Sequence, residues 1–160
     1  MKRDTQMSYC LDSPLGEIEV ALNDAYLVGL RFADRQARST LPQAPGAVRS
    51  LLANWFAGRS SGLEMVSPQL PGTEFQREVW RALRSIPRGE SISYRALAAQ
   101  LGRPRSVRAV AAAVAANPVL LLLPCHRVIG ADGQLRGYAG GVERKRALLE
   151  LERAPMGEGA

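Results

Sequence analysis

The first third of the chain alternates apolar and polar residues in the manner of half-buried β-strands. Three such segments, residues 8–11, 17–22 and 26–32, are separated by turn-forming stretches around Pro14 and Asn23. A period of two places successive side chains on opposite faces of a sheet. The pattern therefore predicts a small antiparallel meander.

Farther along the chain, apolar residues recur every three or four positions, as on one face of an amphipathic helix. This period predicts a helix over residues 47–57 and another over residues 73–85, which follows a linker. Thr73 and Gln76 fit a capping box at the start of the second helix. The apolar faces of these helices include Trp55 and Trp80, which we therefore interpret as core residues.

Two shorter helices are predicted over residues 94–101 and about 105–116, on either side of Gly102 and Pro104. A helix, a short turn and a second helix form the outline of a helix-turn-helix. Any α-hairpin produces the same outline, so the pattern alone leaves both interpretations open.

The second of these helices has two unlike faces. The core face is predicted at the helical spacing of Val107, Val110, Ala111 and Val114. The opposite face is smooth apart from two arginines and consists of Arg105, Arg108, Ala109, Ala112 and Ala116. Such a face fits close approach to a nucleic-acid groove. Alternatively, it reflects only that alanine is the best helix former.

An apolar run over residues 119–123, which predicts a core strand, leads into Pro124-Cys125-His126-Arg127-Val128. This motif holds the chain's only histidine beside one of its two cysteines. A thiolate is the nucleophilic form of cysteine, and cationic or proton-accepting neighbours favour it. We therefore expect a reactive thiol with a depressed pKa, at a point where the chain bends.

The C-terminal part continues with a turn at residues 131–133 and a glycine-rich loop at residues 137–141 around Tyr138. The loop does not have a dinucleotide-binding or phosphate-loop spacing. A last helix is predicted over Val142–Arg153, and the tail from residue 154 is expected to fray.

The composition is that of a globular protein. The 160 residues are 46% hydrophobic and 22% charged, enough for one domain or two small ones. No stretch approaches the roughly 20 apolar residues of a membrane helix, and the polar N-terminus predicts no secretory signal. The two distant cysteines, Cys10 and Cys125, suggest reduced thiols in the cytoplasm. With a single histidine, we expect no zinc site of the usual ligand count.

The net charge of +6 lies entirely in the second half of the chain. Residues 1–72 carry seven basic and seven acidic side chains, whereas residues 73–160 carry fourteen basic and eight acidic ones. No acidic residue occurs between Glu90 and Asp132, a stretch with five arginines. A one-sided basic stretch fits a polyanionic partner, and equally a solvated basic face.

In combination, the Pro-Cys-His-Arg-Val motif, the preceding Asn117-Pro118 and helix pair, and the following Gly-Tyr-Ala-Gly-Gly loop resemble the O6-alkylguanine-DNA alkyltransferases, or methylated-DNA–protein-cysteine methyltransferases. The resemblance spans residues 73–152, and the first seventy residues agree only in outline. It implies an α+β fold. The N-terminal domain, residues 1–70, would hold a small antiparallel sheet plus a helix and be ribonuclease H-like. A mostly helical domain, residues 73–160, would hold the helix-turn-helix, about residues 94–116, and the active-site cysteine.

The resemblance implies a single-turnover DNA repair enzyme. It would flip O6-alkylguanine out of duplex DNA and transfer the alkyl (methyl) group irreversibly to Cys125, with O4-alkylthymine open as a further substrate. His126 would act as base through a water, and Glu152 would orient His126. Asn117 would brace the active-site turn. Tyr94 would assist nucleotide rotation and contact the guanine.

The resemblance also implies the residues that bind DNA and line the pocket. Arg108 would be the arginine finger that fills the gap left by the flipped base. Other DNA contacts would come from Arg105, Ser93, Ala109 and Ala112. The substrate pocket would be formed by Val128, Tyr138, Ala139 and Gly140. Many relatives have serine in place of Ala139.

The implied partner is double-stranded DNA that contains O6-alkylguanine, with no cofactor, no metal and no membrane. The protein would be a cytoplasmic monomer, nucleoid-associated when bound, with or without cooperative binding to DNA. Three alternatives remain. Alkyltransferase-like lesion-recognition proteins lack the acceptor cysteine, which is present here. A helix-turn-helix regulator leaves the Cys-His-Arg run and Glu152 unexplained, although buried structural cysteines are common. A cysteine hydrolase usually draws its base from a distant part of the chain.

Overall fold

The structure, a computed structural model, describes residues 6–33, 39–135 and 137–153. The strands are β1 (Gln6–Leu11), β2 (Ile18–Asn23), β3 (Tyr26–Phe32), β4 (Ile92–Ser93) and β5 (Val128–Ile129). The helices are α1 (Gly46–Phe56), α2 (Glu74–Leu83), α3 (Tyr94–Gln100), α4 (Val107–Ala115) and α5 (Val142–Arg153), with 3-10 turns η1 (Leu63–Met65) and η2 (Cys125–Arg127). Within these ranges no helix has the length and apolar character needed to cross a membrane. The predicted fraying of the tail from residue 154 concerns residues outside the described part.

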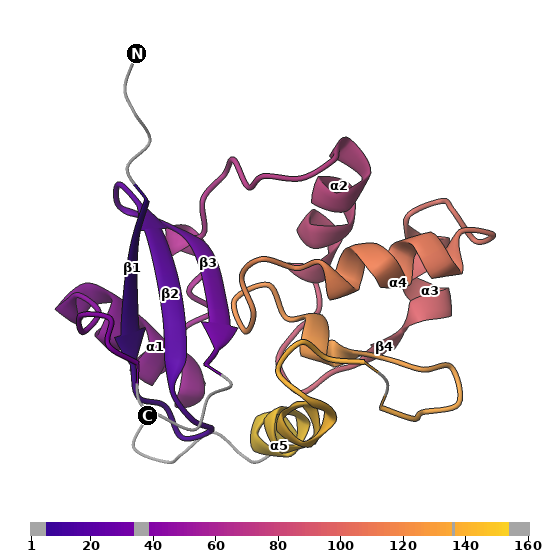
Figure 1. The fold of residues 1–160 in the computed structure, drawn as a ribbon. Helices are drawn as coiled ribbons and strands as arrows, with labels where there is room; N and C mark the ends of the chain where they lie inside the picture. Colours follow the sequence, from indigo (N-terminus) through magenta and orange to yellow (C-terminus); the bar gives the residue numbers. More distant parts are fainter. Residues whose placement is uncertain (1–5, 34–38, 136, 154–160) are drawn as a thin grey trace.

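The N-terminal strands form the predicted antiparallel meander in the order β1-β2-β3, with α1 behind the sheet (Figure 1). Ile18 of β2 lies opposite Leu11 of β1 and Phe32 of β3, and all three are buried. Helix α1 contributes buried Val48, Leu51, Leu52 and Trp55. The mixed α+β architecture that the resemblance implies is therefore confirmed.

Helices α2 to α5 form a second group, and β3 is the sheet strand nearest to it (Figure 1). Helix α2 begins with the predicted capping box, because Gln76 N donates to Thr73 Oγ1 over 3.1 Å and Thr73 N donates to Gln76 Oε1 over 2.9 Å. Trp80 of α2 donates its indole N–H to the carbonyl of Ala113 in α4 over 2.8 Å. This bond fixes α4 against α2, and the prediction that both tryptophans are core residues is confirmed by their burial.

The predicted faces of α4 are confirmed with one correction. Arg105, Arg108, Ala109, Ala112 and Ala116 are all exposed, as predicted. Val110 and Val114 are buried, but the third buried residue is Ala113, whereas the predicted core residues Val107 and Ala111 are only half-buried. Ala113 is buried because α2 packs against this side of α4, where the Trp80 indole bonds the carbonyl of Ala113.

The predicted core strand over residues 119–123 is wrong. The segment is a buried turn in which Leu121 has a left-handed backbone with φ +73°, and only Val119 pairs with a strand, by an isolated bridge to Leu30. Leu30 N donates to Pro118 O over 2.9 Å, and Leu120 N donates to Leu30 O over 3.0 Å. An apolar run reports burial but does not distinguish a strand from a buried turn. These bonds attach the N-terminal sheet directly to the segment that leads to Cys125.

Candidate active site

The Cys-His-Arg run forms η2, a single 3-10 turn between Pro124 and β5. β5 pairs in parallel with β4, with Val128 opposite Ile92, so the end of the turn is anchored to the strand that precedes α3. The bend that we predicted between Cys125 and His126 is therefore this 3-10 turn, which directs consecutive side chains at about a third of a turn from each other.

Asn117 holds the approach to this turn. Its Nδ2 donates to the carbonyl of Leu123 over 2.7 Å, and its Oδ1 accepts from Val119 N over 2.9 Å. The side chain thus closes the buried turn over residues 119–123 from both ends. A hydrogen bond from Asn117 also lowers the pKa of Cys125, against the larger effect of burial.

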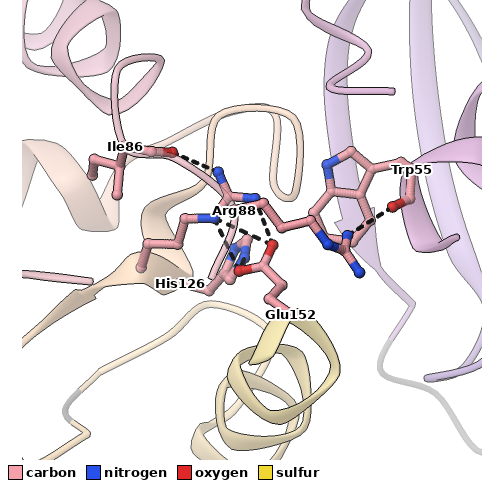
Figure 2. Close-up of polar contacts among 6 residues, drawn as sticks. Trp55, Ile86, Arg88, His126 and Glu152 are labelled. Carbon is pink, nitrogen blue, oxygen red and sulfur yellow. Dashed lines mark hydrogen bonds and ion pairs between the residues drawn. The ribbon is translucent and has the colours of Figure 1, made fainter. Parts of the chain in front are cut away.

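A carboxylate from the last helix meets the turn from the other side. Glu152 Oε1 lies 3.0 Å from His126 Nε2 (Figure 2). Arg127 Nε donates to the same oxygen over 2.9 Å. Arg127 also donates to Ile86 O over 2.7 Å. Side chains of His126 and Glu152 are fully buried, so this network lies in a low-dielectric interior, where charge-assisted hydrogen bonds are strong.

The network decides the protonation of both partners. Burial raises the pKa of Glu152, but hydrogen bonds from Arg127 and His126 outweigh it and lower that pKa to about 2. Burial lowers the pKa of His126, more than Glu152 raises it. At neutral pH an ionised carboxylate therefore faces a neutral imidazole. A carboxylate only accepts, so His126 carries its proton on Nε2 and its Nδ1 is a free base.

The thiol is protonated at rest. Burial raises the pKa of Cys125 to about 11, although the Asn117 hydrogen bond and the charge of Lys145 lower it. Our expectation of a depressed pKa is wrong, because burial outweighs these two effects and the Arg127 guanidinium binds Glu152 and the carbonyl of Ile86 instead of the thiol. Cys125 thus needs a base to become a nucleophile. The adjacent imidazole has an unprotonated nitrogen, Nδ1, that has no hydrogen-bond partner among the described residues.

Cys125 opens to a small pocket between α3, α4 and the glycine-rich loop. It is lined by Tyr94, Val114, Ala115, Cys125, Gly137, Tyr138 and Ala139. Its cavity volume of about 10 Å³ accommodates roughly one water molecule and no purine base. The Tyr138 hydroxyl is buried without a hydrogen-bond partner in the described part of the chain. A donor left in this state at the edge of a pocket is available to a ligand.

Comparison with known proteins now decides the family. A profile described as "6-O-methylguanine DNA methyltransferase, DNA binding domain" matches residues 74–154. The methylated-DNA–protein-cysteine methyltransferase of Mycolicibacterium paratuberculosis is 45% identical over 150 residues, which cover 89% of this chain and 90% of that protein. The chain belongs to the 6-O-methylguanine DNA methyltransferase family.

Two further relatives of this methyltransferase family support the assignment. The methylated-DNA–protein-cysteine methyltransferase of Salmonella typhimurium is 54% identical over 108 residues, 68% of this chain and 63% of that protein. The crystal structure of the Mycobacterium tuberculosis OGT in complex with DNA superimposes with a TM-score of 0.81, at 42% identity and 92% coverage of both chains.

Within this methyltransferase fold, the predicted site residues fall into two groups. Cys125, Tyr94, Tyr138 and Ala139 meet at the pocket, whereas Val128 and Gly140 are not among the residues that line it. The residues predicted to contact DNA lie elsewhere: Arg105, Arg108, Ala109 and Ala112 are exposed on or before α4, and Ser93 caps α3 by accepting from Ala96 N over 3.0 Å.

Lys145 is a site residue that sequence reasoning missed. It is fully buried in α5, and its charge lowers the pKa of Cys125. Its Nζ lies 5.7 Å from the centre of the Tyr94 ring. A signal was available, because Lys145, Leu148, Leu149 and Glu152 have the helical spacing of a buried face.

Arg144 is a second missed residue, and it connects the pocket loop to the N-terminal sheet. Its Nε donates to Leu15 O over 2.9 Å, and its Nη1 donates to Gly140 O over 3.1 Å. The guanidinium also stacks on Phe32 at 4.6 Å. Gly140 has no room for a side chain, since a Cβ there would lie 2.7 Å from the Tyr138 ring and 2.9 Å from Phe32. The N-terminal residues Leu15 and Phe32 thus help to hold the pocket wall in place.

Proposed function

We propose that this chain repairs DNA by transferring the alkyl group of O6-alkylguanine in duplex DNA to Cys125, once per molecule. The observation that carries the proposal is the buried Cys125 thiol beside a neutral His126, whose Nε2 is hydrogen-bonded to the ionised Glu152. The names of the relatives specify the methyl donor as methylated DNA and the acceptor as a protein cysteine.

The residues suggest a simple sequence of steps. A water between the two side chains would pass the thiol proton of Cys125 to His126 Nδ1, while the Nε2 proton stays on the hydrogen bond to Glu152. The sulfur lone pair then forms a bond to the alkyl carbon as the carbon–O6 bond breaks. The electron pair of that bond leaves on the guanine, which takes up the proton that came from the Cys125 thiol. The product is a thioether that water does not cleave, so each molecule acts once.

DNA binding is proposed for the pair α3 and α4, as a helix-turn-helix with α4 in a groove. The exposed alanines of α4 leave room for close approach, and Arg108 would enter the duplex in place of the flipped base. Arg105, Ser93, Ala109 and Ala112 would contact the DNA around it. The relative from Mycobacterium tuberculosis was crystallised with DNA.

Base recognition is proposed for the pocket next to Cys125. Tyr94 would assist rotation and contact the guanine, Tyr138 would form a wall, and backbone groups near Val128, Ala139 and Gly140 would read its edge. Because the pocket now holds about 10 Å³, its walls must separate before a base can enter. We further propose a ribonuclease H-like N-terminal domain at residues 1–70, a C-terminal domain at residues 73–160, and a monomer acting in the cytoplasm.

Incubation with duplex DNA that carries a radiolabelled O6-methylguanine tests the proposal. We expect the label to appear on the Cys125 peptide and to stop at one equivalent per protein. Lack of label on the protein would leave a lesion-binding or regulatory role. Release of labelled product with continued turnover would instead indicate a hydrolase.

The pH dependence of alkyl transfer tests the role of His126. The pKa of Cys125 is about 11, so an attack by thiolate formed without a base would accelerate about tenfold per pH unit between pH 7 and 10. With His126 as base, we expect a nearly flat rate over that range and a fall at acidic pH, because the imidazole pKa is lowered and its neutral form persists above it. A unit slope in single-turnover measurements from pH 7 to 10 would exclude His126 as the base.

The Arg108→Ala variant tests the arginine finger. We expect single-turnover repair of duplex DNA to slow by about ten- to a hundredfold, since base flipping costs a few kcal/mol and an inserted side chain offsets part of it. Transfer from free O6-benzylguanine should change little. Arg146→Ala, on the exposed side of α5, serves as the matched control. Equal losses with duplex and free base would contradict the finger role.

A further inference from the structure

A cleft of about 260 Å³ lies behind the catalytic turn, between the turn that follows α1 and the segment that follows α2. Four of the residues that line it are arginines and two are serines: Arg59, Arg84, Arg88, Arg127, Ser60 and Ser61. None of the lining residues belongs to α3 or α4. We name this feature the arginine cleft.

The arginine cleft has an uncompensated positive charge. Among the described residues that line it, none is acidic. Arg127 is neutralised by Glu152, but Arg59 and Arg84 are exposed and Arg88 is half-buried in the same wall. Gathering guanidinium groups without a carboxylate is unfavourable, and a bound anion would relieve this repulsion.

Residues that line the cleft also carry hydrogen-bond donors without acceptors. Arg88 donates through Nη1 to Trp55 O over 3.1 Å, as Figure 2 shows, but its buried Nε has no partner among the described residues. Buried donors are nearly always paired in folded proteins. Ser60 and Ser61 accept backbone N–H groups through their oxygens, over 3.1 and 3.4 Å, which leaves their hydroxyl protons available. The wall therefore offers donors and positive charge together.

We propose that the arginine cleft binds a small phosphate-type oxyanion, free or as the phosphate group of a small molecule. Guanidinium forks match phosphate oxygens with paired hydrogen bonds, and hydroxyls add further donors. The volume lies just below that of pockets for drug-sized ligands. Because α3 and α4 take no part in the cleft, the anion binds independently of DNA. Arg127 joins the cleft to Glu152, so an occupied cleft also stabilises the segment that supports the catalytic turn.

Isothermal titration with inorganic pyrophosphate, at constant ionic strength maintained with sodium chloride, tests the site. We expect one saturable site on the wild-type protein. The Arg59→Gln/Arg84→Gln double variant, at two exposed positions, should bind at least about tenfold more weakly, since hydrogen bonds to charged groups are lost. Arg49→Gln/Arg146→Gln removes the same charge at exposed positions outside the cleft and should bind like the wild type.

Arg88→Gln tests the unpartnered buried donor, with circular dichroism to verify the fold. It should weaken pyrophosphate binding by a similar factor.

Alkyl transfer to Cys125 should stay unchanged in both double variants, which separates this site from the repair reaction. Three results would overturn the proposal: no saturable binding, equal weakening in the two double variants, or displacement of pyrophosphate by lesion-free duplex DNA. The second would indicate net charge alone, and the third a DNA-binding surface.

Discussion

Replacement of Cys125 by alanine is expected to abolish alkyl transfer completely while leaving DNA binding intact. The thiol is 5% exposed, and among the residues that line the pocket Cys125 alone carries a thiol. Loss of the sulfur removes the proposed acceptor, and the neighbouring imidazole then has no thiol proton to withdraw. The measurement is label on the protein after incubation with duplex O6-methylguanine, with lesion binding followed by gel shift.

Cys10→Ala is the matched control, because Cys10 is the other cysteine and is equally buried and free. It lies in β1, where its sulfur donates to Leu41 O over 3.1 Å. Its loss should lower the free energy of unfolding by about 1 kcal/mol and leave the extent of labelling unchanged. Label retained by Cys125→Ala, or lost only in Cys10→Ala, would contradict the assignment of the acceptor.

Glu152→Gln is expected to slow transfer by about a hundredfold or more and to destabilise the fold. A glutamine amide can turn its NH₂ group toward His126 Nε2, which then accepts, and the imidazole proton moves to Nδ1. The nitrogen that should accept the thiol proton is thereby blocked, and general-base catalysis is typically worth 10²- to 10⁴-fold. Arg127 also loses its counter-charge, and breaking such a buried pair costs about 3–5 kcal/mol.

The pH dependence of stability separates these two effects. The pKa of Glu152 is lowered from 4.5 to about 2 in the folded protein, so its ionised form stabilises the fold above pH 4.5. That contribution is lost as the pH falls toward 2, and the difference in unfolding free energy between wild type and Glu152→Gln should shrink over the same interval. Glu150→Gln, an exposed neighbour on α5, should alter neither rate nor stability. A constant difference from pH 7 to 2 would contradict the ionised state of Glu152.

Local patterns were sufficient to predict most elements of this fold. Alternation located the three strands, and helical periods located all five α-helices to within two residues at each end. The capping box at Thr73 was predicted because its two hydrogen bonds connect residues three positions apart. The buried turn at residues 119–123 was mistaken for a strand because apolar content is the same for both. Its true shape depends on Asn117 and on pairing with Leu30.

Some features of the candidate site could likewise be predicted from the sequence, and others could not. The adjacency of Cys125 and His126, and the resemblance that pointed to Glu152, are properties of the linear chain. The protonation states depend on burial and on partners far apart in sequence. Arg127 next to the thiol suggested a lowered pKa, yet the guanidinium turns to Glu152, 25 positions away, and burial raises the pKa of Cys125 instead.

The sequence by itself therefore determined which groups are available for the chemistry: one thiol, one imidazole, one carboxylate and an exposed arginine-bearing helix. Only the tertiary structure decided how they are used. It placed Lys145 in the interior near Cys125, and through Arg144 it linked the N-terminal residue Leu15 to Gly140 of the pocket loop. It also gathered the arginines of the arginine cleft from three separate segments. The physical reason is that secondary structure follows from contacts within a few residues, whereas desolvation and charge pairing follow from contacts that the whole fold creates.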